Sequence, residues 1–146
     1  MNPACCFTGF HQLTYQQEHA LAKPLEAELL YLIHQNISAF LSGGEPGFDR
    51  MAAEAILALK QKGQPLRLTL VLPESAGANE KKQGEDALLS GADAIVRLTG
   101  SPESPSQYLA RNATVCLCAY SPSEGVPPTV RFAEKRGLQI INIAEP

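Results

Sequence analysis

The chain has 146 residues and a mass of 15.7 kDa, with 45% hydrophobic and 18% charged residues, as is typical of a single globular domain spanning residues 1–146. Its net charge of −3 at pH 7 makes a broad nucleic-acid-binding face unexpected. No apolar run approaches the roughly 18–20 residues of a membrane span, and the N-terminus has no signal-peptide pattern, so we expect a cytoplasmic protein without a membrane partner.

Short apolar runs alternate with segments of helical periodicity along the chain. In chain order, the pattern predicts a strand over residues 4–10, an irregular polar segment over 10–23, a helix over 24–37, a strand over 39–42, a glycine-rich loop, a helix from 49 to about 62, a strand over 66–73, a helix over 79–91, a strand over 93–100, a helix over 104–112, a strand over 113–120, a helix over 127–137 and a strand over 138–143. Pro24 would then lie in the first turn of its helix, where proline is tolerated.

This alternation of strands and helices predicts an α/β fold. Strands that are apolar on both faces indicate a mainly parallel sheet covered on both sides, in a doubly wound, Rossmann-like three-layer sandwich. The loops that follow the strands gather at the carboxyl edge of such a sheet, where ligands bind. That edge would collect the segments 8–9, 42–47, 73–74, 99–100 and 121–125, which are rich in small and polar residues.

The four cysteines are Cys5, Cys6, Cys116 and Cys118, and all lie in apolar strand-like runs. Alternation along a strand sends Cys116 and Cys118 to the same face. A metal site more often shows C-x-x-C pairs in loops together with suitably spaced histidines, a pattern that this sequence lacks. We therefore expect reduced, at least partly buried cysteines and no metal or other cofactor.

The segment "SGGEPGFD" places three glycines between a strand and a helix. One interpretation is a tight turn that only glycine can make. The other is an anion cradle, in which Gly43 and Gly44 let the backbone approach a phosphate and the N–H groups of Phe48, Asp49 and Arg50 point at it. Asp49 is also a suitable N-cap residue. The segment is neither a Walker A loop nor a G-x-G-x-x-G loop, so both interpretations stay open.

Four segments together resemble the YpsA-like branch of the SLOG superfamily: "CCFTGFHQL", "FLSGGEPGFDRMAAEAILALK", "LTLVLPE" and "TVRFAEKRGLQIINI". These Rossmann-type domains are grouped with the cytokinin-activating LOG enzymes and the DNA-processing protein DprA. Residues 42–54 match the family pattern S-G-G-[AL]-x-G-[VF]-D-x-x-A-A-E almost throughout. The resemblance implies a nucleotide or nucleotide-derived ligand in the crevice. By motif match, the implied ligand-binding residues are Thr8, Gly9, Ser42, Gly43, Gly44, Gly47, Asp49, Arg111 and Asn112.

The chain also departs from the family pattern and looks like a diverged or shortened member. The first loop of the family usually reads T-G-H-R-P, whereas this chain has "TGFHQL". The R-N pair of the family is usually followed by several further helix residues, whereas "ARN" here runs directly into "ATVCLCAY". The phosphoribohydrolase signature P-G-G-x-G-T-x-x-E of LOG enzymes is absent. Relatives in the superfamily often dimerise, which makes a homodimer an expectation by analogy.

Three functions remain open at this point. The first is a sensor-like module that binds a small nucleotide-like molecule. The second is a hydrolase of the nucleoside-monophosphate phosphoribohydrolase type, for which Asp49, Glu54 and Glu74 are the carboxylates nearest the loops. No nucleophile with an adjacent base is recognisable in the sequence, so the catalytic residues stay unknown. The third is an interaction module that kept the fold and lost the ligand, which the altered loops would explain.

Overall fold

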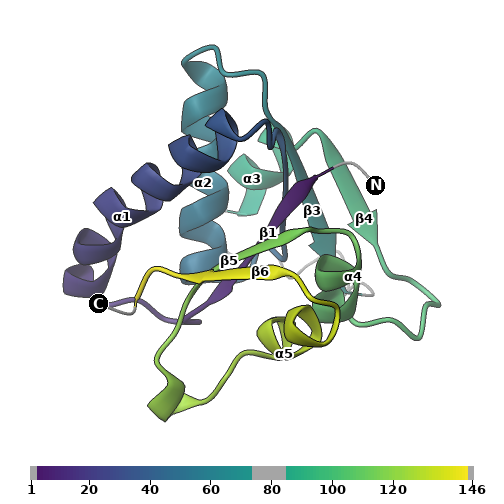
Figure 1. Ribbon diagram of the computed structural model, residues 1–146. Helices are drawn as coiled ribbons and strands as arrows, with labels where there is room; N and C mark the ends of the chain where they lie inside the picture. Colours follow the sequence, from purple (N-terminus) through teal and green to yellow (C-terminus); the bar gives the residue numbers. More distant parts are fainter. Residues whose placement is uncertain (1–2, 74–84, 145–146) are drawn as a thin grey trace.

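The computed structural model describes residues 3–73 and 85–144, and Figure 1 shows their arrangement. In chain order the elements are β1 (Ala4–Gly9), α1 (Tyr15–His34), β2 (Ala39–Ser42), α2 (Phe48–Gln61), β3 (Arg67–Leu72), α3 (Glu85–Gly91), β4 (Ala94–Arg97), α4 (Pro105–Arg111), β5 (Val115–Ala119), the 3₁₀ helix η1 (Pro122–Glu124), α5 (Pro128–Lys135) and β6 (Gln139–Asn142). The predicted helix start at Asn79 and the carboxylate of Glu74 lie outside the described residues.

The six strands form one sheet in the order β4-β3-β2-β1-β5-β6, and every adjacent pair is parallel. This confirms the predicted α/β, doubly wound parallel sheet. From β1 the chain first adds strands on one side, β2 to β4, and then β5 and β6 on the other. The order therefore reverses between β1 and β5. At such a reversal the loops that follow the two central strands diverge, which opens a crevice at the carboxyl edge.

Helices cover both faces of the sheet (Figure 1), and each face has its own apolar core. The core on the side of α1, α2 and α3 includes Phe7 and Phe40, whose rings stack with centroids 5.8 Å apart. The core on the side of α4 and α5 includes Leu109 and Val130. Because consecutive residues of β1 point to opposite faces, Phe7 belongs to the first core and its neighbour Cys6 to the second. In the part of the chain that the structure describes, no helix is long and apolar enough to cross a membrane.

Helix α1 begins at Tyr15, nine residues before the predicted start, so the prediction of an irregular segment over 10–23 holds for 10–14 and was wrong for 15–23. The cause is a capping box. The Thr14 hydroxyl accepts a hydrogen bond from the Gln17 N–H at 3.0 Å, and the Gln17 amide oxygen accepts one from the Thr14 N–H at 2.9 Å. Pro24 therefore lies inside the helix rather than in its first turn. Leu21, which is buried, already continues the apolar stripe of this helix.

All four cysteines are buried and unpaired, as the sequence predicts. Cys6, Cys116 and Cys118 line the core under α4 and α5, while Cys5 faces the opposite core. Burial raises the pKa of the Cys5 thiol well above its ordinary value. Within the described residues, no group of three or more His, Cys, Asp or Glu side chains could hold a metal ion.

We expect native thiol labelling to be slow at all four cysteines, because each side chain is completely buried and a reagent can reach it only when the structure opens. The measurement is the labelling rate with and without denaturant. Fast modification of two or more thiols under native conditions would contradict this burial.

Candidate functional site

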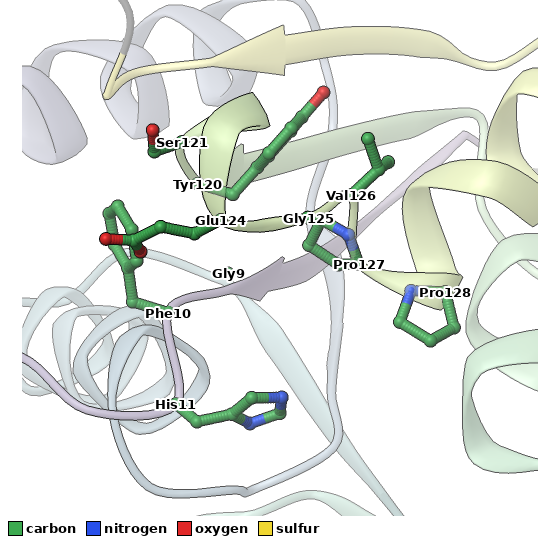
Figure 2. A pocket seen from close by; sticks show the side chains of 10 residues that line it. All are labelled: Gly9, Phe10, His11, Tyr120, Ser121, Glu124, Gly125, Val126, Pro127 and Pro128. Carbon is green, nitrogen blue, oxygen red and sulfur yellow. The ribbon is translucent and has the colours of Figure 1, made fainter.

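A cavity of about 280 Å³ occupies the crevice at the carboxyl edge, where the strand order reverses. One wall is the loop that follows β1, and the other is the segment between β5 and α5 (Figure 2). Its lining residues are Gly9, Phe10, His11, Tyr120, Ser121, Glu124, Gly125, Val126, Pro127 and Pro128. We call this cavity the switch-point crevice.

The loops that follow β1 and β2 are joined by backbone contacts. The Phe48 N–H donates to the Phe10 carbonyl oxygen at 2.8 Å. Gly47 has φ +91°, and a Cβ atom at this position would lie 2.1 Å from the same carbonyl oxygen. His11 Nδ1 lies 3.1 Å from a carboxylate oxygen of Glu45, between two exposed side chains. The first wall of the crevice is therefore held against the glycine loop.

Ser42 fastens the glycine loop to the helix that follows it. The Ser42 side chain is completely buried. Its hydroxyl donates to the Asp49 carbonyl oxygen at 3.1 Å and accepts from the Gly44 N–H at 3.1 Å. Both hydrogen-bonding directions of the hydroxyl are thus used within the loop, which favours the tight-turn interpretation for this residue.

Asp49 is the second residue of α2, and Gly47 is the N-cap, so the N-cap role considered for Asp49 is not observed. Its carboxyl group lies against the glycine loop: a Cβ atom added at Gly43 would be only 3.2 Å from Asp49 Oδ2. Desolvation by burial, and then the nearby negative charge of Glu45, raise the pKa of the Asp49 carboxyl well above its usual range.

The start of α2 has fewer spare donors than the anion-cradle interpretation requires. Of the three N–H groups expected to point at an anion, that of Phe48 donates to the Phe10 carbonyl and that of Arg50 to the Glu45 carbonyl at 3.1 Å. For these two groups the expectation of free donors was wrong. A backbone carbonyl from the loop after β1 occupies a position where an anion would otherwise accept.

Thr8 and Gly9 form the end of β1, in the centre of the sheet. Thr8 is buried on the face that also carries Cys6. A Cβ atom at Gly9 would lie 2.4 Å from the Ala119 carbonyl oxygen and 3.0 Å from Phe48 side-chain atoms. Glycine at this position therefore has a packing reason, in addition to its place on the crevice wall.

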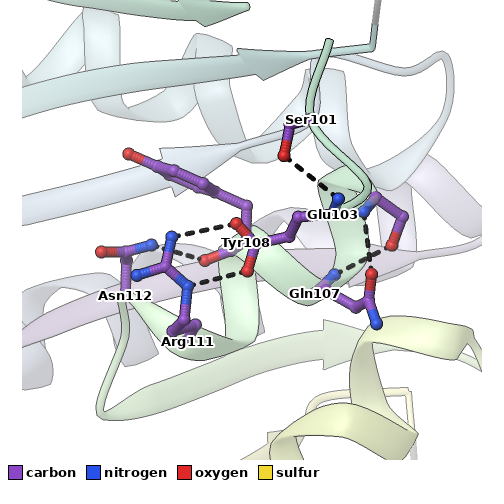
Figure 3. Close-up of polar contacts among 7 residues, drawn as sticks. Ser101, Glu103, Gln107, Tyr108, Arg111 and Asn112 are labelled. Atoms are coloured by element: carbon purple, nitrogen blue, oxygen red, sulfur yellow. Dashed lines mark hydrogen bonds and ion pairs between the residues drawn. The ribbon is translucent and has the colours of Figure 1, made fainter. Parts of the chain in front are cut away.

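The structure separates Arg111 and Asn112 from the other seven implied site residues. They end α4 directly before β5, at the amino edge of the sheet, whereas the other seven lie at or beside the carboxyl edge. The Arg111 guanidinium makes two hydrogen bonds to the Glu103 carboxylate, at 2.7 and 2.9 Å, and lies over the Tyr108 ring (Figure 3). The Asn112 amide donates to the Tyr108 carbonyl at 2.9 Å. The structure therefore does not bring this pair to the switch-point crevice.

Sequence reasoning missed most of the second wall of the crevice. The loop 121–125 was expected at this edge, but neither η1 nor the residues Tyr120 and Glu124 were singled out. The signal was present in "YSPSEGVPP", where Pro122 precedes and Pro127 and Pro128 follow Gly125, whose φ is +107°. Such a segment makes a fixed, irregular turn rather than a helix start directly after the strand.

Comparison with known proteins supports this fold. No protein-family model matches the chain. The UPF0398 protein BH1768 of Halalkalibacterium halodurans is 27% identical over 132 residues, which covers 82% of this chain and 70% of that protein. The X-ray structure of TM1055 is similar with a TM-score of 0.61 and 14% sequence identity, covering 94% of this chain and 72% of that chain. The fold is Rossmann-like α/β. At 14% identity the structural likeness establishes the fold alone.

Proposed function

We propose that the protein binds a nucleotide-derived small molecule in the switch-point crevice, as a binding module of the sensor type. The observation that carries this proposal is the position of the cavity. It lies at the point where the strand order of a parallel sheet reverses, which is where open α/β sheets hold their ligands. The sequence resemblance to the SLOG superfamily, together with the Rossmann-like fold, supports a ligand of this class.

The lining of the crevice suits a small ligand that has both apolar and polar parts. Phe10 and Tyr120 are half-buried aromatic residues, and Pro127 adds a rigid apolar surface. Ser121 and Glu124 supply polar groups from the β5–α5 wall, to which Tyr120 and Pro127 also belong (Figure 2). Most pockets that bind small molecules combine apolar walls with a few polar groups of this kind.

Two neighbouring serines offer a matched test. Ser121 lines the crevice and Ser123 does not, yet their hydroxyls are bonded to each other at 2.9 Å, so replacing either one loses the same hydrogen bond. We expect Ser121→Phe to abolish thermal stabilisation by bases, nucleosides and nucleotides, because the ring would fill the cavity. Ser123→Phe should respond like the wild type. At about 100 times Kd, a ligand stabilises the native protein by roughly 2.7 kcal/mol, which is readily measured.

The same panel separates the alternatives. A wild type that responds to no base, nucleoside or nucleotide refutes the proposal and favours the interaction module. Equal responses of the two phenylalanine variants would place the ligand elsewhere, which also refutes it. Release of free base from a nucleoside monophosphate, followed by chromatography, would instead establish the hydrolase.

A further inference from the structure

We infer that the switch-point crevice takes an unphosphorylated, planar heteroaromatic ligand with N–H donors, namely a nucleoside or its free base, in preference to a nucleotide polyphosphate. This inference rests on the proposed function and narrows its ligand. It comes from three independent features of the described residues: the starts of the helices around the crevice, the charges that line it, and one aromatic residue on each wall.

The three helices that begin beside the crevice have few backbone donors left for a phosphate. In α1, the N–H groups of Gln17 and Glu18 bond to the side chain and the carbonyl of Thr14. In α2, the Phe10 and Glu45 carbonyls accept from the first turn, as described above.

Helix α5 begins with Pro127 as its N-cap and Pro128 as its first residue, and neither has an N–H group. The N–H groups of Val130 and Arg131 both donate to the Pro127 carbonyl. Phosphate sites in α/β sheets depend on such helix starts. Each of the three helix starts thus has at least one of its first three N–H groups missing or already bonded, which makes it a weaker phosphate site than a helix start with all three free.

The charges of the crevice disfavour an anion as well. Among the described residues that line it there is no lysine or arginine, and its carboxylate is that of Glu124. Glu45 lies beside the first wall, in contact with His11. Arg50 lines a different hollow, which it shares with Glu18 and Glu54. A triphosphate would thus meet the Glu124 carboxylate with no lysine or arginine among the described lining residues to compensate its charge.

The remaining groups match a neutral ring with donors. Phe10 and Tyr120 offer aromatic surfaces against which a planar heterocycle can stack. Glu124 projects from η1 toward the Phe10 side of the crevice (Figure 2), and it lines both the crevice and the adjoining hollow beside α1. Its carboxylate can accept hydrogen bonds from an exocyclic amine or from ribose hydroxyls. Hydrogen bonds to a charged acceptor are about twice as strong as neutral ones.

The experiment measures the Kd of adenosine, AMP and ATP by titration calorimetry with wild type, Glu124→Gln and Glu134→Gln. Glu134 is exposed on α5 and does not line the crevice, so its variant controls for net charge. For wild type we expect affinity to fall from adenosine to AMP to ATP, with adenosine at least about tenfold tighter than ATP at about 20 mM salt. This ratio should shrink at about 500 mM salt, because salt screens the repulsion.

Glu124→Gln should weaken adenosine binding about fivefold and strengthen ATP binding about threefold, because it removes a charged acceptor and a repulsive charge together. Glu134→Gln should change neither affinity. If ATP binds as tightly as adenosine or more tightly, and if this binding is lost in Ser121→Phe, the inference is overturned and the proposed function still stands. If neither this series nor the panel of bases, nucleosides and nucleotides contains a ligand whose binding depends on Ser121, the proposed function and this inference both fail.

Discussion

Replacing Gly47 by alanine is expected to lower the free energy of unfolding by about 3 kcal/mol, the largest effect of any single methyl group added to the glycine loop. Two causes combine. The backbone at Gly47 has φ +91°, a left-handed conformation that costs L-residues about 1–2 kcal/mol. The new Cβ would also lie 2.1 Å from the Phe10 carbonyl oxygen and 2.6 Å from the His11 carbonyl carbon, so backbone must move.

Gly44 provides the control, because its φ is also positive but an added Cβ would meet no backbone atom within 4 Å. Its φ is +69°, and the nearest atom to an added Cβ would be Leu72 Cδ2, at 3.7 Å. Gly44→Ala should therefore cost only the conformational part, about 1–2 kcal/mol. Chemical denaturation of both variants measures the difference. If both variants lose the same free energy of unfolding, the close contact of Gly47 with the backbone of Phe10 and His11 contributes nothing to stability.

Asp49→Asn is expected to raise the free energy of unfolding at neutral pH and to remove a pH dependence from the wild type. The pKa of this carboxyl is raised in the folded protein, so between the unfolded pKa, about 3.9, and the folded pKa the native state binds more protons than the unfolded state. Stability from this group is thus fully present below about pH 4 and is lost as pH rises. The slope from one group is at most about 1.4 kcal/mol per pH unit.

The pKa of the Asp93 carboxyl is shifted in the opposite direction, so Asp93 serves as the control for that experiment. Hydrogen bonds from Lys60, at 2.6 Å, and from the Leu68 N–H, at 2.8 Å, lower the pKa of the Asp93 carboxyl. Its contribution is present above the unfolded pKa and is lost as pH falls through the folded pKa. Asp93→Asn should therefore destabilise the protein at neutral pH, whereas Asp49→Asn stabilises it. Denaturation of both variants from pH 3 to pH 8 tests the pair, and a parallel response would contradict the burial of Asp49.

The fold could be predicted because its signals are local. Apolar runs such as "VCLCA" and the glycine and proline breaks between them define strands and helices without knowledge of their partners. The start of α1 was misplaced because its polar first turn, held by Thr14 and Gln17, has weak apolar periodicity. A capping-box search of residues 14–17 would have found it.

The site was harder to predict, because its residues meet only through tertiary contacts. The glycine motif correctly marked the loop after β2, yet the Phe10 carbonyl that occupies the start of α2 comes from a segment 38 positions earlier in the chain than Phe48. A motif defines the conformation of its own backbone, but it does not state which other segment fills the space in front. For Arg111 and Asn112, the motif matched in sequence, but the structure places the pair at the end of α4, at the other edge of the sheet.

The hydrogen bond between Phe48 and Phe10 makes the two walls of the crevice unequal in their tolerance of change. A substitution in the first wall disturbs the start of α2 and, through it, the core around Phe48, which is completely buried. Positions 122–125 in the second wall are exposed and belong to neither core, so their replacement leaves both cores in place. Selectivity for a new ligand is therefore best engineered by exchanging residues 122–125 as a unit, while the β1 and β2 loops and the core-packed residues Tyr120 and Val126 stay unchanged.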